Sequence, residues 1–108
     1  MDERTRRVGL NEALFREVNE RITDVARVFD VAAEELSIVC ECGHIDCAEQ
    51  ISIPASEYER IRSESTLFAV VPGHVIPEVE HVVERHESHS VVRKDEGEAA
   101  QLARELDR

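Results

Sequence analysis

The chain has 108 residues, the usual size of a single domain, and 42% of them are hydrophobic, enough to build a core. Its 24 acidic and 13 basic residues give a formal net charge of -11, spread evenly over both halves. This balance excludes binding to nucleic acid or to an anionic membrane through a basic surface. The acidic surface either keeps the protein in solution or attracts a basic partner, and the charge does not decide between the two.

No apolar run is long enough for a transmembrane helix, and the start, Met1 to Arg4, lacks the apolar segment of a secretion signal. We therefore expect a cytoplasmic protein. The three cysteines agree with this, because an odd number within eight residues argues against a disulfide framework.

Residues 4–30 are predicted to form one long helix, because apolar residues recur every three or four positions. This stripe consists of Leu14, Val18, Ile22, Val25 and Phe29, flanked by Phe15 and Ala26. Charged side chains fall off the stripe: Glu12, Arg16, Glu20 and Asp24. The favoured prediction is that the stripe packs on the rest of the domain. The alternative is that it pairs with a helix of a second copy or of another partner.

Three polar residues in the body of this helix are Asn11, Arg16 and Asn19. We expect them on the surface, with a polar contact across an interface as the alternative. Gly9 lowers helix stability by roughly 1 kcal/mol relative to Ala, so the first turns are expected to fray.

Residues 36–42 are predicted to form a strand, and Glu49 to Ile53 a returning strand, with turn residues Gly43 and Asp46 between them. The resulting hairpin has all three thiols at its tip. A short helix follows from Pro54, with capping-box spacing between Ser56 and Glu59 and an inner face that carries Tyr58 and Ile61.

The second half of the chain continues with a buried strand at 67–71 and a turn at Pro72-Gly73. Two strands, 79–85 and 89–94, are joined by a tight turn. A helix at 97–106 ends the chain, with Asp95 as the expected N-cap. Its inner side is expected to carry Ala99, Leu102, Ala103 and Leu106.

These elements predict an α+β fold over residues 1–108 as a single domain. The long N-terminal helix at 4–30 is expected to cover a small, mainly antiparallel sheet of four or five strands. The sheet region at 36–94 carries the metal-binding hairpin, and the C-terminal helix at 97–106 lies beside it.

The cysteines Cys40, Cys42 and Cys47 indicate a metal site. Zinc prefers four thiolate or imidazole ligands in a tetrahedron, and a turn brings thiolates together without long-range folding. The spacing Cys-x-Cys-x4-Cys is less specific than a Cys-x2-Cys knuckle. Free thiols and a redox switch are the weaker interpretations.

The fourth ligand is open from spacing alone. His74 ranks first, because the Pro72-Gly73 turn could present its imidazole to the hairpin tip. His44, Asp46, water or another histidine are the alternatives. A Cys3His set makes a closed, structural site, whereas water in the fourth position leaves an open one with catalytic potential. Zinc is favoured over iron by tetrahedral Cys/His ligation.

Three further histidines, His81, His86 and His89, lie close together in the sequence. In one strand His81 and His86 would point to opposite faces, which weakens a joint metal site. We expect all three on the surface of a hairpin.

The segments Asn11 to Arg21, Cys40-Glu41-Cys42 and Pro72-Gly73-His74 together resemble a family of small bacterial proteins found mainly in actinobacteria. The resemblance covers most of the chain. It implies a cytoplasmic protein in which these cysteines and this histidine occur together. It implies no activity and therefore adds no mechanism.

No nucleophile triad, phosphate-binding glycine loop or dinucleotide fingerprint occurs in the sequence. We therefore expect a non-catalytic protein-binding or regulatory module with a structural zinc ion on Cys40, Cys42, Cys47 and His74. Its partner is expected to be a protein, with a homodimer through the N-terminal helix as one form. A zinc-thiolate redox sensor and an enzyme with an open zinc site are the alternative functions.

Overall fold

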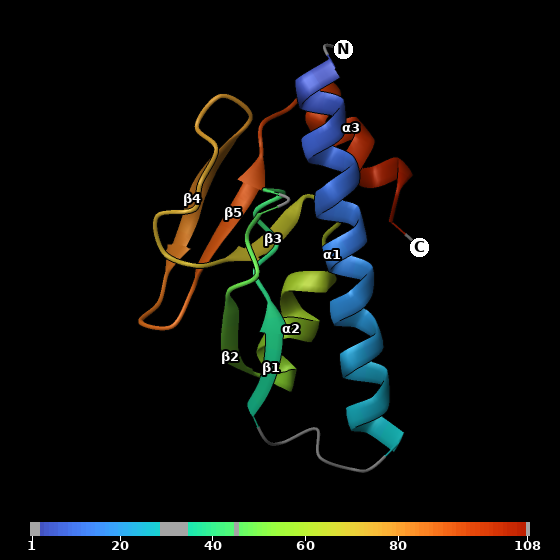
Figure 1. The fold of residues 1–108 in the computed structure, drawn as a ribbon, viewed down its shortest axis with the longest axis vertical. Helices are drawn as coiled ribbons and strands as arrows, with labels where there is room; N and C mark the ends of the chain where they lie inside the picture. Colours follow the sequence, from blue (N-terminus) through green and yellow to red (C-terminus); the bar gives the residue numbers. More distant parts are fainter. Residues whose placement is uncertain (1–2, 29–34, 45, 108) are drawn as a thin grey trace.

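A computed structural model describes residues 3–28, 35–44 and 46–107, and it confirms the α+β class (Figure 1). Its elements in chain order are α1 (Glu3–Val28), β1 (Glu35–Val39), β2 (Gln50–Pro54), α2 (Ala55–Arg62), β3 (Leu67–Val70), β4 (Glu80–Arg85), β5 (Ser90–Lys94) and α3 (Glu98–Glu105). The long helix α1 lies along one side of the molecule, and α3 lies beside its N-terminal half. No helix among the described residues combines the length and the apolar character needed to cross a membrane.

The strands form two small antiparallel sheets rather than one sheet of four or five strands. In the first, β1 pairs with β2, and Ile38 lies opposite Ile51. The second has the strand order β3-β5-β4. The two sheets are separate because β1 ends at Val39, earlier than the predicted residue 42. The chain then turns towards β3, where the Glu41 amide donates to the Ala69 carbonyl at 2.9 Å.

The core lies where the two sheets meet α2. Alternate residues of β1 and β2 are buried, as expected for strands with one covered face, whereas all four residues of β3 are buried. Tyr58 and Ile61 are on the inner face of α2, as predicted. The largest buried apolar side chains are Tyr58, Phe68, Ile38, Ile51, Ile53, Ile61, Val70 and Val91.

The predicted helix caps were wrong at both short helices. Helix α2 begins directly after Pro54, which supplies a fixed φ but no side-chain hydrogen bond, and Ser56 lies inside the helix. At α3 the N-cap is Gly97 rather than Asp95, with a φ of 131° that favours glycine. On α3, Ala100 and Ala103 are buried, and Leu106 is exposed.

The orientation predicted for α1 was also wrong. Leu14, Val18 and Val25 are exposed, although Ile22 packs against the core and Ala26 is buried. Phe29 lies outside the described residues. The buried face is instead largely polar and consists of Glu12, Arg16, Asn19 and Thr23. The expectation that Arg16 and Asn19 lie on the surface is therefore contradicted.

Most of the buried polar side chains of α1 are satisfied by groups that lie far away in sequence. Thr23 is the exception, because its Oγ1 donates to the Asn19 carbonyl one turn earlier in the helix, at 3.1 Å. Asn19 pairs with the end of β1, because its Oδ1 accepts from the Val39 amide at 2.8 Å and its Nδ2 donates to the Val39 carbonyl at 2.8 Å. Arg16 donates to the carbonyls of Ser65 and Ala103, at 2.7 and 3.0 Å. Such partners remove the penalty of burying polar groups, so the polar face can point inwards.

Gly9 lies where α1 and α3 pack closely together. A Cβ at this position would overlap a terminal methyl carbon of Leu102, so this flexible side chain would have to shift.

Candidate metal centre

The three cysteines lie at the end of the β1-β2 hairpin, as predicted. The Cys40 amide donates to the Glu49 carbonyl at 2.9 Å, which continues the hairpin by one bond, and the Cys47 amide donates to the His44 carbonyl at 3.0 Å. Between them Gly43 has a φ of +81°, in the left-handed region that glycine adopts without strain. The turn thereby brings residues 40, 42 and 47 to one place.

His74 is presented by a second turn, after β3. Its amide donates to the Val71 carbonyl at 2.9 Å, and Gly73 has a φ of +91°. This turn directs the imidazole towards the hairpin tip. The Nδ1 atom lies 3.6 Å from the Cys40 sulfur and 3.7 Å from the Cys47 sulfur.

Four potential ligand atoms therefore converge. The sulfurs of Cys40, Cys42 and Cys47 and one ring nitrogen of His74 all lie within 4.8 Å of one another, close enough to hold a metal ion. A tetrahedral zinc site, with bond lengths of about 2.3 Å to sulfur and about 2.0–2.1 Å to nitrogen, places sulfur and nitrogen about 3.6 Å apart. The sulfur-to-nitrogen distances at Cys40 and Cys47 agree with this value. His44 and Asp46, the alternative ligands, are exposed and do not belong to the converging group.

The four potential ligand atoms are shielded from solvent on the side that faces the interior of the protein. Cys40 and Cys42 are fully buried, and Cys47 is partly buried. The Val71 amide donates to the Cys40 sulfur at 3.2 Å, a contact that stabilises a thiolate. A hydrogen bond from the Cys40 thiol lowers the pKa of Cys42 to about 4, and the same bond raises the pKa of Cys40. Negative charge therefore concentrates on Cys42, and a bound cation would hold all three cysteines as thiolates.

Glu49 orients the histidine from the other side. Its Oε2 lies 3.0 Å from His74 Nε2, so the ring can present Nδ1 to the sulfurs while Nε2–H donates to the carboxylate. Metal-binding histidines are commonly held by a carboxylate in this way. From the sequence, Glu49 was expected only as the first residue of the returning strand and not as a partner of His74; the observed strand β2 begins one residue later, at Gln50.

We expect Glu49→Ala to weaken zinc binding by about 10–100-fold, the usual cost of losing such an orienting partner. Zinc affinity can be measured by competition with a chromogenic chelator. Glu87→Ala, which removes an exposed glutamate far along the chain, is the matched control and should leave the affinity unchanged. Equal affinities for the two variants would contradict a role for Glu49.

Helix α1 lies directly against the cysteine loop. Asn11 Nδ2 donates to the Gly43 carbonyl at 3.0 Å. A Cβ on Gly43 would lie 2.8 Å from Cγ of Glu12 and 2.9 Å from a methyl group of Val8. Gly43 is therefore required both by its φ and by the closeness of α1, and Asn11 supports the metal loop rather than lying free on the surface.

Between the first two cysteines, Glu41 is fully buried and connects three elements. Its carboxylate accepts from Tyr58 Oη at 2.6 Å, from Asn19 Nδ2 at 2.9 Å and from the Ala69 amide at 3.0 Å. Burial raises its pKa, and the three donors partly offset this by stabilising the charged form. The only sequence signal for this network is a single acidic residue within the apolar segment 36–42.

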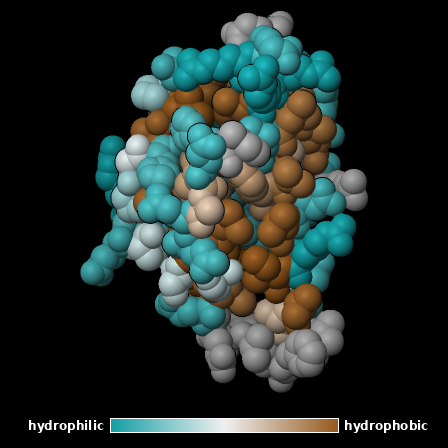
Figure 2. All heavy atoms as spheres, viewed as in Figure 1, coloured by the Kyte–Doolittle hydropathy of each residue, from teal (hydrophilic) through white to brown (hydrophobic). Residues whose placement is uncertain are grey.

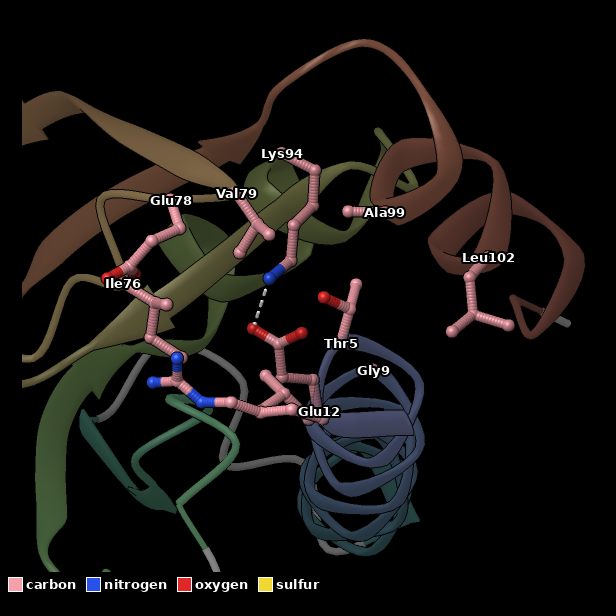
Figure 3. A pocket seen from close by; sticks show the side chains of 11 residues that line it. Thr5, Gly9, Glu12, Ile76, Glu78, Val79, Lys94, Ala99 and Leu102 are labelled. Carbon is pink, nitrogen blue, oxygen red and sulfur yellow. Dashed lines mark hydrogen bonds and ion pairs between the residues drawn. The ribbon is translucent and has the colours of Figure 1, made fainter. Parts of the chain in front are cut away.

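A second buried ionic group lies beside the N-terminal half of α1 (Figure 3). Lys94 Nζ contacts Glu12 Oε2 and Glu80 Oε1, each at 2.6 Å, and all three side chains are almost completely buried. The other oxygen of Glu80 accepts from the Ile76 amide at 3.0 Å. The adjoining pocket is small and mostly apolar, with Val79, Ala99 and Leu102 among its walls. We interpret this group as structural.

One cation faces two carboxylates here, so the group retains a proton at neutral pH. Burial, with the charge of Glu80, raises the pKa of Glu12 from 4.5 to about 8 despite the opposing charge of Lys94. Between pH 4.5 and about pH 8, Glu12 is protonated in the folded protein but ionised in the unfolded chain. Stability therefore falls as the pH rises through this window, by up to about 1.4 kcal/mol per pH unit for one group.

We expect Glu12→Gln to remove this contribution. The free energy of unfolding of the wild type should fall relative to that of the variant between pH 6 and 8. Urea unfolding of both zinc-loaded proteins at several pH values measures the difference, in which the titration of other groups cancels. A difference that stays constant with pH would show that Glu12 does not titrate in this range.

The predicted surface position of the three histidines holds for His81 and His86 but is wrong for His89, which is only 3% exposed. Its ring stacks on that of His86, with centroids 4.7 Å apart, and the His86 amide donates to the His89 carbonyl at 2.9 Å. His86, His89 and Glu57 also form a group within reach of a metal ion. Arg60, however, already donates to Glu57 and Glu84 at 2.6 and 2.7 Å, so a guanidinium supplies the positive charge there.

Comparison with known proteins gives no further assignment. No protein-family model, curated protein or solved structure matches this chain. The resemblance to small actinobacterial proteins thus stays a prediction.

Proposed function

We propose that the protein is a non-catalytic protein-binding or regulatory module stabilised by one zinc ion on Cys40, Cys42, Cys47 and His74. The observation that carries this proposal is the convergence of four potential ligand atoms within 4.8 Å. Thiolate and imidazole ligands in a tetrahedral set favour zinc over the oxygen-seeking cations. Three thiolates, one neutral imidazole and Zn²⁺ sum to a charge of -1, which the Val71 amide helps to stabilise.

A structural role is supported by the number and source of the ligands. Four protein ligands complete a tetrahedron, whereas catalytic zinc keeps one position for water or substrate. An open site would require His74 to stay away from the metal, and its Nδ1 lies 3.6 Å from the Cys40 sulfur. The site also joins the hairpin to the turn after β3, which is the arrangement of a structural cross-link.

The binding role rests on the surface. A net charge of -11 attracts basic partners, and α1 presents large apolar side chains to solvent. Both features suit contact with another protein.

The proposal is tested by metal content and by activity. Elemental analysis of the purified protein should give one zinc per chain, and Cys42→Ser should give much less than one. The matched control Ser88→Ala, which alters an exposed residue in the turn between β4 and β5, should retain one zinc. Zinc-dependent turnover in a panel of hydrolase and transferase assays would overturn the non-catalytic assignment.

A zinc-thiolate redox sensor is the second candidate, and it is favoured by the position of Cys47. Cys47 is only partly buried and borders an open depression whose walls include His44 and Gly73, so an oxidant can reach its sulfur. Hydrogen peroxide would oxidise one thiolate to a sulfenic acid and release hydroxide. A second thiol would then displace water to form a disulfide, with loss of the metal.

Peroxide titration separates the two candidates. A sensor should release zinc, measured with a chromogenic chelator, at peroxide doses that oxidise ordinary exposed thiols. Zinc that stays bound at those doses would eliminate the sensor and leave the structural role.

A further inference from the structure

Two histidines of the turn between β4 and β5 lie against each other. The His86 amide donates to the His89 carbonyl at 2.9 Å, which closes a turn of four residues. The two rings stack, with centroids 4.7 Å apart and planes inclined by 22°. Figure 2 shows mostly hydrophilic surface on this side of the molecule, at the left of the view, where β4 and β5 lie. The turn thus joins His86 to His89, whereas His81 contacts Asp95 at 2.7 Å.

Helix α2 supplies a carboxylate to this pair of rings. Glu57 Oε1 lies 3.9 Å from Nε2 of His86 and 3.9 Å from Nε2 of His89. One ligand atom from each of the three residues lies within 4.8 Å of the other two. In a tetrahedral zinc site, nitrogen and oxygen ligands are about 3.3 Å apart, so the three atoms need to approach by roughly 0.6 Å to hold one ion. The His86 side chain is 42% exposed and has room to make this movement.

The buried nitrogen of His89 indicates that a ligand belongs here. His89 is 3% exposed, and its Nε2 atom is closed to solvent and has no hydrogen-bond partner among the described residues. Its Nδ1 atom lies 2.9 Å from the Ser88 hydroxyl oxygen, which can accept a hydrogen from Nδ1. Burial lowers the pKa of His89, so the ring is neutral at pH 7 and, with its hydrogen on Nδ1, has a free lone pair on Nε2. A buried polar atom without a partner costs free energy, and a metal ion on Nε2 would remove that cost.

The charges around the two rings leave a place for a cation besides Arg60. The Arg60 guanidinium donates to Glu57 and Glu84 at 2.6 and 2.7 Å, so one positive charge faces two carboxylates. Glu84 Oε1 also lies 2.8 Å from His86 Nε2, where it accepts the hydrogen of the ring. A metal ion would replace this hydrogen, and Glu84 is then near enough to become a fourth ligand. Arg60 can keep its bonds, because a carboxylate has about four lone-pair positions.

We propose that Glu57, His86 and His89 form a second metal site, which binds a divalent transition-metal ion such as Zn²⁺. Imidazole and carboxylate ligands suit these ions, whereas Mg²⁺ and Ca²⁺ prefer oxygen ligands alone. The site contains no thiolate and has to close around the ion, so it binds zinc more weakly than the cysteine site and fills only when zinc is added in excess. A metal ion here would join α2 to the turn between β4 and β5, independently of the zinc on the cysteines.

Calorimetric titration of the protein that already holds one zinc tests the proposal. Added Zn²⁺ should bind as one further equivalent per chain, and Mg²⁺ should not bind. His86→Ala should weaken this second binding at least tenfold, because losing even an orienting partner of a ligand costs about 10–100-fold. The first zinc should be retained, since His86 is exposed and far along the chain from the cysteines. His81→Ala is the matched control: it also removes an exposed histidine that contacts a carboxylate, and it should leave the second binding unchanged.

Nuclear magnetic resonance locates the second ion. The second equivalent of Zn²⁺ should shift the ring resonances of His86 and His89 and leave those of His81 unchanged. Glu57→Gln, which keeps the size of the side chain but removes its charge, should also weaken the second binding at least tenfold. Absence of a second equivalent, or a second equivalent with equal affinity in His86→Ala and His81→Ala, would overturn the site. Because the protein holds its first zinc at the start, such a result would leave the cysteine site unaffected.

Discussion

His74→Ala is expected to lose its zinc and to melt far below the wild type. If His74 completes the site, it joins the turn after β3 to the Cys40–Cys47 hairpin, so metal binding becomes part of the folding free energy. Structural zinc supplies on the order of 10 kcal/mol in small peptides, as much as the ~5–10 kcal/mol of a typical small domain. Elemental analysis and thermal melts, with and without chelator, measure both effects.

Three histidine variants serve as controls. His44→Ala and His81→Ala should keep one zinc and melt close to the wild type, because both side chains are exposed. His89→Ala should also keep its zinc but melt lower, since it removes a buried ring that stacks on His86. A His74→Ala protein that retains zinc, together with a His44→Ala protein that loses it, would place the fourth ligand in the loop.

The second large effect is expected at Lys94. Lys94→Met leaves Glu12 and Glu80 buried without their cation, and breaking a buried ion pair in this way costs about 3–5 kcal/mol. Most of this cost is the desolvation of an unpaired carboxylate rather than the lost attraction. Urea unfolding of the zinc-loaded protein measures the loss of stability.

Arg104→Met is the matched control. It also removes one cation from an ion pair, but the Arg104–Glu96 pair is exposed, and such pairs contribute about 0–1 kcal/mol. A combined Glu80→Gln and Lys94→Met variant should be more stable than Lys94→Met alone, because the second buried carboxyl group is then replaced by a neutral amide. Equal stability of Lys94→Met and Arg104→Met would contradict the buried ionic group.

Local patterns in the sequence predicted the elements and the metal-binding group. Turn residues predicted both loops, and the three cysteines lie within eight positions of one another. The turn at Pro72-Gly73 indicated His74 as the residue that lies close to the cysteines. Each of these signals depends on neighbours in the chain. The same holds for the hairpin of β1 and β2, which two short apolar segments and the turn residues between them predicted.

The inward face of α1 could not be predicted in this way. The helical period was correct, but the apolar stripe was assigned to the interior because unpaired polar groups are costly to bury. The partners that make burial of Arg16 and Glu12 favourable, the Ala103 carbonyl and Lys94, are 87 and 82 residues away. Only the folded chain reveals such pairs. His89 was misplaced for a different, local reason: its ring stacks on that of His86 within the β4-β5 turn, and no periodic pattern in the sequence marks such a stack.

These distant pairs also set an order of events during folding. As the chain emerges in synthesis, α1 comes first and can coil locally within microseconds. Two charged residues on the inward face of α1 find their partners only later. Lys94, which pairs with Glu12, lies at the end of β5, and the Ala103 carbonyl, which accepts from Arg16, lies in α3. Asn19 can reach β1 early, over a loop of 20 residues, whereas the contacts of Glu12 and Arg16 close loops of 82 and 87 residues and are expected to be completed among the last.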